Sequence, residues 1–175
     1  MEFDKVLKLR RSVRKYTDIP VSDEELKEVL DAAQTSPLAM GDDKTTHITV
    51  VKSPEVMEKV RNVCLTKSIK TGNIIDALYG AKLMIILSAT DLSEDCIEYS
   101  NVACVIENIM LKATDLGLGS TYIWGCLRKL RENKEVVSCL KIPEGYKILS
   151  AVVIGHPEKP LEEREKKDKI SVNFV

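Results

Sequence analysis

Three arginines and a serine lie close together near the start of the chain, in the run Arg10-Arg11-Ser12-Val13-Arg14. Each guanidinium group carries five N–H donors in a fixed plane and keeps its charge at any physiological pH. The run follows apolar residues at helical spacing (Phe3, Val6, Leu7), so we expect its charges to fall within one turn. Such a cluster suits a phosphate group. The alternative is a solvated helix end, where basic side chains favour the negative pole of the helix dipole.

The composition predicts one globular domain over residues 1–175, with residues 158–175 as a C-terminal arm. The 175 residues are 44% hydrophobic and 30% charged, which is enough apolar material for a core. The net charge is −1, from 26 basic and 27 acidic side chains. The chain therefore lacks the positive field that non-specific nucleic-acid binding uses, and any basic site must be local.

The N-terminus and the cysteines predict a cytoplasmic protein without metal. Acidic and basic residues interrupt the N-terminal apolar residues, and the longest apolar run, Leu83–Leu87, is too short to span a bilayer. Five cysteines without a Cys-x-x-Cys pair argue against a disulfide framework and a zinc site. We expect reduced, mostly buried thiols. His47 and His156 have no partner at metal-ligand spacing.

Hydrophobic periodicity predicts alternating helices and strands. Ser22-Asp23-Glu24-Glu25 is a capping box that opens a helix over 23–35. A long helix is expected over 98–116, and shorter ones after Pro54 and over 127–137. Strands are expected over 47–51, 83–87, 120–124 and 147–155. This order favours an α+β layer fold, and no Gly-x-Gly-x-x-Gly follows a strand, so a Rossmann site is not indicated.

The arm changes from charged residues over 158–169 to an apolar, strand-like end over 170–175. These last residues cannot bury themselves, so the arm is expected to lie on a partner surface. A flexible tail is the alternative.

Five motifs occur in one order along the chain, and together they resemble the FMN-dependent nitroreductase superfamily in its short single-domain form, over roughly residues 6–164. They are Arg10-Arg11-Ser12-Val13-Arg14, Ser36-Pro37-Leu38-Ala39-Met40, Leu116-Gly117-Leu118-Gly119-Ser120-Thr121-Tyr122-Ile123-Trp124-Gly125, Ile142-Pro143-Glu144-Gly145-Tyr146 and Val153-Ile154-Gly155-His156-Pro157.

The resemblance implies a three-layer α+β fold with a central mixed sheet flanked by helices, a long central helix, and a C-terminal arm exchanged across a homodimer. It also implies one FMN at each interface site. Members pass a hydride from NADH or NADPH to the flavin, and then to a nitroaromatic, quinone or flavin-like acceptor, by a ping-pong route. The flavin carries this chemistry, so no catalytic residue of the protein is expected.

The resemblance also assigns roles to residues. The arginine run corresponds to the phosphate and ribityl site, and Arg164 to a basic residue of the arm that reaches the phosphate. The loop from Pro37 to Gly41 corresponds to a segment that contacts the flavin from the second subunit. Trp124-Gly125 corresponds to the pair against the isoalloxazine ring, with a backbone N–H toward N5. The expected cofactor-binding residues are Arg10, Arg11, Ser12, Arg14, Pro37, Leu38, Ala39, Met40, Gly41, Trp124, Gly125 and Arg164.

One loop departs from the family pattern. Gly41-Asp42-Asp43-Lys44 stands where members usually have Asn-x-Gln-Pro. An ionised carboxylate only accepts hydrogen bonds and would oppose negative charge on a reduced flavin. We therefore expect FMN to bind with a lower reduction potential than in relatives with the amide pair.

Two other functions stay open at this point: an FMN-binding, storage or sensing protein with little turnover, and a flavin-free phosphate or nucleotide binder.

Overall fold

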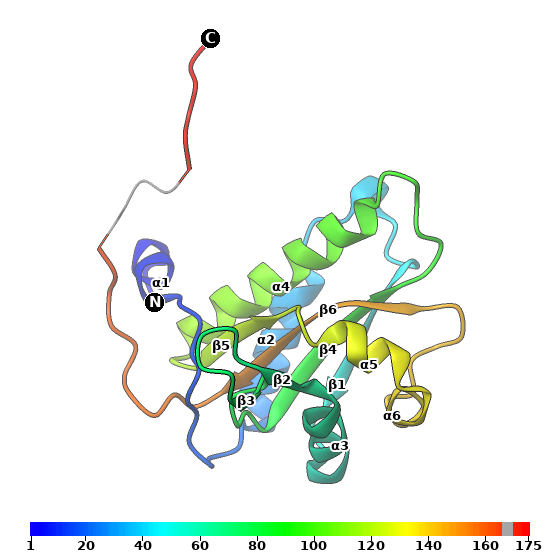
Figure 1. Ribbon diagram of the computed structural model, residues 1–175. Coiled ribbons are helices and arrows are strands. Elements are labelled where there is room, and N and C mark those ends of the chain that lie inside the picture. The colour runs from blue at the N-terminus through cyan, green and yellow to red at the C-terminus, as the bar shows by residue number, and fades with distance from the viewer. Residues whose placement is uncertain (166–169) are drawn as a thin grey trace.

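A four-stranded sheet in the order β1-β4-β6-β5 forms the centre of the molecule (Figure 1). The computed structural model of the chain describes residues 1–165 and 170–175. The helices are α1 (Phe3–Leu9), α2 (Asp23–Gln34), α3 (Pro54–Cys64), α4 (Ile97–Asp115), α5 (Leu127–Glu132) and α6 (Lys134–Cys139), with a 3-10 turn η1 (Ala39–Gly41). The strands are β1 (Thr46–Val51), β2 (Leu65–Lys67), β3 (Ile74–Asp76), β4 (Leu83–Ala89), β5 (Gly119–Ile123) and β6 (Lys147–Gly155).

The expected three layers are confirmed. Helices α2 and α4 cover one face of the sheet, and α3, α5 and α6 cover the other. Every residue of β4 is buried, because this strand lies between two neighbours and under helices on both faces. The continuous apolar run at 83–87 predicts this burial.

The pairing of the strands requires a correction to the expected mixed sheet. All three pairings of the four-stranded sheet are antiparallel. The β2–β3 hairpin brings the chain back to the end of the sheet where β1 finishes, so β4 starts beside the end of β1, with Met84 opposite Val51. In the described part of the chain, the parallel component is a single bridge between Ser12 and Ser120.

Local signals set most helix boundaries. The capping box of α2 is present, with the Glu25 N–H donating to Ser22 Oγ at 3.1 Å and the Ser22 N–H donating to Glu25 at 2.8 Å. The helix expected over 127–137 is instead two helices, because Asn133 caps α6 by accepting from the Val136 N–H at 3.0 Å. The β2–β3 hairpin was not predicted.

The cysteines are less buried than expected. Cys64 at the end of α3 and Cys126 at the start of α5 lie in the core, and Cys139 is half-buried, but Cys96 and Cys104 are exposed. Cys96 precedes α4 in a left-handed conformation, and Cys104 lies on the outer side of that helix. No helix within the described residues is long and apolar enough to cross a membrane.

The first part of the C-terminal arm runs antiparallel to the N-terminal segment of its own chain. The Glu158 N–H donates to the Lys15 carbonyl at 3.2 Å, and the Arg164 N–H donates to the Lys8 carbonyl at 3.1 Å. Residues 170–175 extend away from the rest of the chain and are exposed. The part of the arm at 166–169 lies outside the described residues. Exchange of the arm with a second copy stays a prediction.

Candidate functional site

The arginine run, residues 10–14, is extended rather than a helical turn. Helix α1 ends at Leu9, and Arg10 has φ −57° and ψ 120°. The Val13 N–H donates to the Ser120 carbonyl at 2.9 Å, which ties the run to the start of β5. Alternate side chains of an extended segment point to opposite sides. Val13 is buried against the sheet, whereas Ser12 and Arg14 on either side of it are exposed.

Two glycines allow this close packing. A Cβ built on Gly119 would lie 2.8 Å from Val13, and one built on Gly155 would lie 2.9 Å from the Tyr16 ring. Gly119 and Gly155 are register partners in β5 and β6. The N-terminal segment can therefore lie against this end of the sheet because neither strand carries a side chain there.

The three arginines have different surroundings. Arg10 forms an ion pair with Glu107 of α4, at 3.8 Å. Arg11 donates to the carbonyl of Glu162 in the arm at 2.7 Å, and its buried Nε has no hydrogen-bond partner in the described chain. The guanidinium carbon of Arg14 lies 5.7 Å from the centre of the Tyr79 ring. Among described residues, no carboxylate lies within 4.0 Å of the basic nitrogens of Arg11 or Arg14, so their charges are available to an anion.

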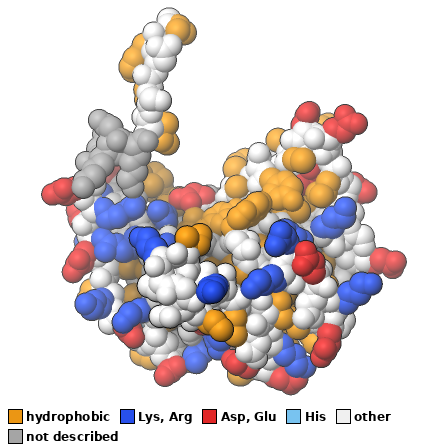
Figure 2. All heavy atoms as spheres, viewed as in Figure 1, with side chains coloured by type: hydrophobic (Ala, Val, Ile, Leu, Met, Phe, Trp, Pro, Cys, Tyr) orange, Lys and Arg blue, Asp and Glu red, His pale blue; other side chains and the backbone are white. Residues whose placement is uncertain are grey.

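A hollow of ≈ 190 Å³ lies between the arginine run and the arm. Four basic side chains and one carboxylate contribute to its lining, which consists of Arg11, Val13, Arg14, Lys15, Pro157, Glu158, Lys159, Pro160 and Leu161. Figure 2 shows basic side chains gathered on the side of the molecule where Figure 1 places α1 and β5. The local excess of positive charge suits an anionic group.

Arg164 lies beside the arginine run but contacts another feature. Its guanidinium donates to the carbonyls of Leu7 and Lys8, at 3.4 and 3.5 Å. These carbonyls belong to the last turn of α1, where a cation is favourable. The structure thus places Arg164 beside the arginine run, as expected, but its side chain caps the C-terminal end of α1.

The Trp124-Gly125 pair forms the other end of the site. Trp124 directly follows β5, is 55% exposed, and packs edge-on against Tyr99 of α4 with ring centres 5.8 Å apart. Ser120, which bridges to Ser12, lies four residues earlier, or about 13 Å along an extended strand. Basic side chains beside the start of β5 and an exposed aromatic side chain just after its end suit an elongated ligand with an anionic group and a planar group.

The loop from Pro37 to Gly41 lies at the N-terminal end of α4. The Ala39 N–H donates to the side chain of Asn101 at 2.9 Å. Met40 is fully exposed in a left-handed conformation with φ 57°. In the chain as described, no hydrogen bond joins this loop to Trp124 or Gly125. Within one chain, the arm brings Arg164 beside the arginine run, and β5 connects the run to Trp124-Gly125. In the Pro37 loop, Leu38 packs on the core and Met40 faces solvent.

Sequence reasoning missed two tyrosines at this site. The ring of Tyr79 lies under Arg14, and Tyr16 packs on Gly155 and donates to Thr121 at 3.3 Å. Burial raises the pKa of Tyr16 above its ordinary value, so this phenol is a neutral structural donor. Gly155 lies within one of the sequence motifs, and a glycine there is a signal that another group, here Tyr16, approaches the strand closely. No sequence signal pairs Tyr79 with Arg14.

Comparisons with known proteins agree with this geometry. The profile described as "Nitroreductase family" matches residues 7–156. A protein of Methanothermobacter thermautotrophicus, named as a candidate NADH dehydrogenase/NAD(P)H nitroreductase, is 31% identical over 165 residues, which cover 90% of this chain and 78% of that protein. The FMN reductase [NAD(P)H] of Bacillus subtilis is 28% identical over 171 residues, covering 89% of this chain and 66% of the relative.

A comparison with solved structures also finds a nitroreductase. The nitroreductase of Bacteroides fragilis NCTC 9343, crystallised with bound FMN, has a TM-score of 0.82 and 26% identity, and the match covers 100% of this chain and 99% of the other. With a family profile that spans most of its length, this chain belongs to the nitroreductase family.

Proposed function

We propose that this protein is an FMN-dependent NAD(P)H oxidoreductase that passes a hydride from the nicotinamide, through FMN, to a nitroaromatic, quinone or flavin-like acceptor. The observation that carries the proposal is the arrangement along β5. Guanidinium groups lie at the start of the strand and an exposed aromatic turn follows its end. Relatives named as an FMN reductase and an NAD(P)H nitroreductase, and a related structure with bound FMN, support it.

The residues of this chain fit FMN. Arg10, Ser12 and Arg14 lie within one extended segment and can contribute to a phosphate site, to which planar guanidinium donors bind in pairs. Charge-assisted hydrogen bonds contribute about 1.5–3 kcal/mol each, so two or three such contacts account for much of a micromolar affinity. At the other end, Trp124 offers an exposed aromatic surface.

When bound, FMN supplies the hydride chemistry, so the protein's task is to hold, orient and shield it. The Gly125 N–H donates to no group of the described residues and is available to a ring nitrogen. A bond from a backbone amide does not depend on the side chain, so tryptophan is compatible with this role.

The proposed active form is a homodimer, in which the Pro37 loop of one copy completes the site of the other. Two features support it. The loop presents fully exposed Met40 to solvent. The arm ends in exposed Ile170, Val172 and Phe174, which alternate along an extended segment and share one side.

Two spectroscopic measurements test the proposed function. The purified protein should be yellow and release FMN on denaturation. Anaerobic mixing with NADH or NADPH should rapidly bleach the visible absorbance of the flavin, and addition of a quinone should restore it. A product released before the acceptor binds would support the ping-pong route. A colourless protein that takes up no added FMN would contradict the proposal.

The Gly41-Asp42-Asp43-Lys44 loop favours a second candidate, an FMN-holding protein with little turnover. Both carboxylates are exposed, and the Lys44 N–H donates to Asp42 at 3.0 Å. Carboxylates near the pyrimidine edge would disfavour the reduced, negatively charged flavin. Retention of FMN without bleaching by either nicotinamide would identify this second function.

A further inference from the structure

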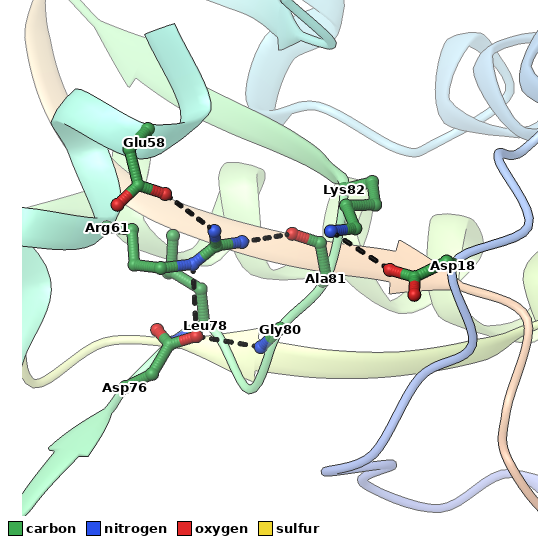
Figure 3. Close-up of polar contacts among 8 residues, drawn as sticks. All are labelled: Asp18, Glu58, Arg61, Asp76, Leu78, Gly80, Ala81 and Lys82. Atoms are coloured by element: carbon green, nitrogen blue, oxygen red, sulfur yellow. Dashed lines mark hydrogen bonds and ion pairs between the residues drawn. The ribbon is translucent and has the colours of Figure 1, made fainter. Parts of the chain in front are cut away.

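The turn between β3 and β4, residues 76–82, is held by a dense set of polar contacts (Figure 3). One oxygen of Asp76 accepts from the Leu78 N–H at 2.8 Å, and the other accepts from the Gly80 N–H at 2.7 Å. That second oxygen also accepts from Arg61 Nε at 3.1 Å. Arg61 in turn donates to the Ala81 carbonyl at 2.8 Å. One ion pair between α3 and the end of β3 therefore fixes the path of the turn.

This network holds Tyr79 in an unusual conformation. Tyr79 has φ 56°, a left-handed conformation that is unfavourable for a residue with a bulky side chain. The Tyr79 N–H donates to the Asp76 carbonyl at 3.2 Å, and the Ala81 N–H donates to the Leu78 carbonyl at 3.1 Å. Backbone strain of this kind persists only where the surroundings determine the conformation. Here Asp76 and Arg61 supply those surroundings.

The turn contacts the N-terminal segment at two places. The Tyr79 ring lies beneath the Arg14 guanidinium at 5.7 Å, inside the range of cation–π attraction. Three residues later, Lys82 forms an ion pair with Asp18 at 3.1 Å. Residues 14–18 are thus attached to the turn at both ends.

Glu58 of α3 also forms an ion pair with Arg61, at 2.9 Å. The guanidinium of Arg61 is therefore fully engaged within the network that holds the turn.

We infer that Tyr79, held by the Asp76–Arg61 ion pair, is a positioning residue that aims the Arg14 guanidinium at the phosphate of the flavin. The inference rests on the proposed function. An aromatic face orients a guanidinium and leaves its edge donors free, whereas a carboxylate partner would occupy them. Tyr79 acts through Arg14 and needs no contact with the ligand.

A purely structural role for Tyr79 makes a different prediction. If the ring only stabilised the turn, its loss would weaken binding of every flavin alike. If it aims Arg14 at the phosphate, its loss weakens FMN and spares riboflavin, which has the same ring and no phosphate. The ratio of the two dissociation constants therefore separates the two roles.

The test is a double-mutant cycle on the full-length protein freed of flavin, with FMN and riboflavin as probes. Tyr79→Asn removes the aromatic face, and asparagine tolerates the left-handed conformation. Tyr79→Asn should weaken FMN binding by roughly threefold to tenfold, and riboflavin binding by less than about twofold. In an Arg14→Ala background the same change should weaken FMN binding by less than about twofold, because the two residues act together.

Two variants serve as controls. Tyr79→Phe keeps the aromatic face and should restore the preference for FMN over riboflavin. Tyr79→Gly, for which a φ of 56° carries no steric cost, replaces Tyr79→Asn if that variant does not fold. Additive effects of Arg14→Ala and Tyr79→Asn, or an equal loss for both flavins, would overturn the inference and leave the proposed function intact. Failure of the wild-type protein to bind FMN would overturn both.

Discussion

Gly119 lies so close to Val13 that a Cβ on the glycine would come within 2.8 Å of three side-chain carbons of the valine. This contact sets the distance between the arginine run and β5. It also explains why the Ser12–Ser120 bridge can form, because any larger residue at 119 would lift the run from the strand. The basic end of the proposed site therefore depends on the absence of a side chain one residue before Ser120.

Replacement of Gly119 by alanine should destabilise the fold by about 1–3 kcal/mol, as expected for overpacking in a well-packed region. FMN affinity should fall as well, because the arginine run is displaced. Urea denaturation measures the first effect and flavin titration the second. Gly125→Ala is a matched stability control, since a Cβ there has no neighbour within 4 Å. Equal stability of the two variants would contradict the steric argument.

Alkaline pH should weaken the fold through Tyr16. Burial raises the pKa of Tyr16 in the folded state, while the unfolded chain has the usual value of about 10. Above that value the unfolded state loses this proton and the folded state keeps it, so stability falls by about 1.4 kcal/mol per pH unit from this group. The contribution is fully present below pH 10 and is lost as the pH rises.

Tyr16→Phe provides the comparison for this effect. It keeps the ring against Gly155 and removes the titrating hydroxyl together with its bond to Thr121. Urea midpoints measured from pH 8 to pH 11 should decline less steeply for the variant than for the wild type. Parallel declines would show that Tyr16 titrates normally.

The departure in the loop after Met40 should lower the flavin potential. Gly41→Asn combined with Asp43→Gln replaces a carboxylate with amides, and asparagine tolerates the φ of 67° at position 41. One hydrogen bond to the charged, reduced flavin contributes about 1.5–3 kcal/mol, which corresponds to an increase of roughly 30–60 mV for a two-electron couple. Potentiometry on both proteins measures the change, with Asp42→Asn as the single-site comparison. An unchanged potential would remove the loop from the proposed site.

The apolar side of the C-terminal tail should stabilise the proposed homodimer. Val172→Ser with Phe174→Ser removes two exposed apolar side chains, which are 72% and 91% exposed in one chain. We expect a rise of at least about tenfold in the dimer dissociation constant, because two buried apolar side chains contribute more than about 1.4 kcal/mol. Sedimentation velocity across a dilution series measures it. Ser171→Ala with Asn173→Ala changes the opposite side of the tail and should leave the dimer dissociation constant unaltered. If both double variants changed this constant equally, a tail that binds its partner through the apolar side would be contradicted.

Much of the architecture could be predicted because its determinants are local. The capping box at Ser22, the proline at the start of α3 and the apolar run of β4 each specify an element through a few neighbouring residues. The β2–β3 hairpin escaped prediction because its strands are three residues each and expose Ile74. Because the hairpin was not predicted, the antiparallel direction of β4 relative to β1 could not be predicted either.

The sequence by itself determined the family motifs, the order of the elements and the presence of a basic run beside an apolar helix. Only the tertiary structure decided that this run is extended, that Gly119 and Gly155 admit Val13 and Tyr16, and that Tyr79 lies beneath Arg14. The physical reason is range. Helix caps and hydrophobic periods act between residues a few positions apart, whereas these contacts join residues 65 to 139 positions apart, and only the packed sheet brings them within reach.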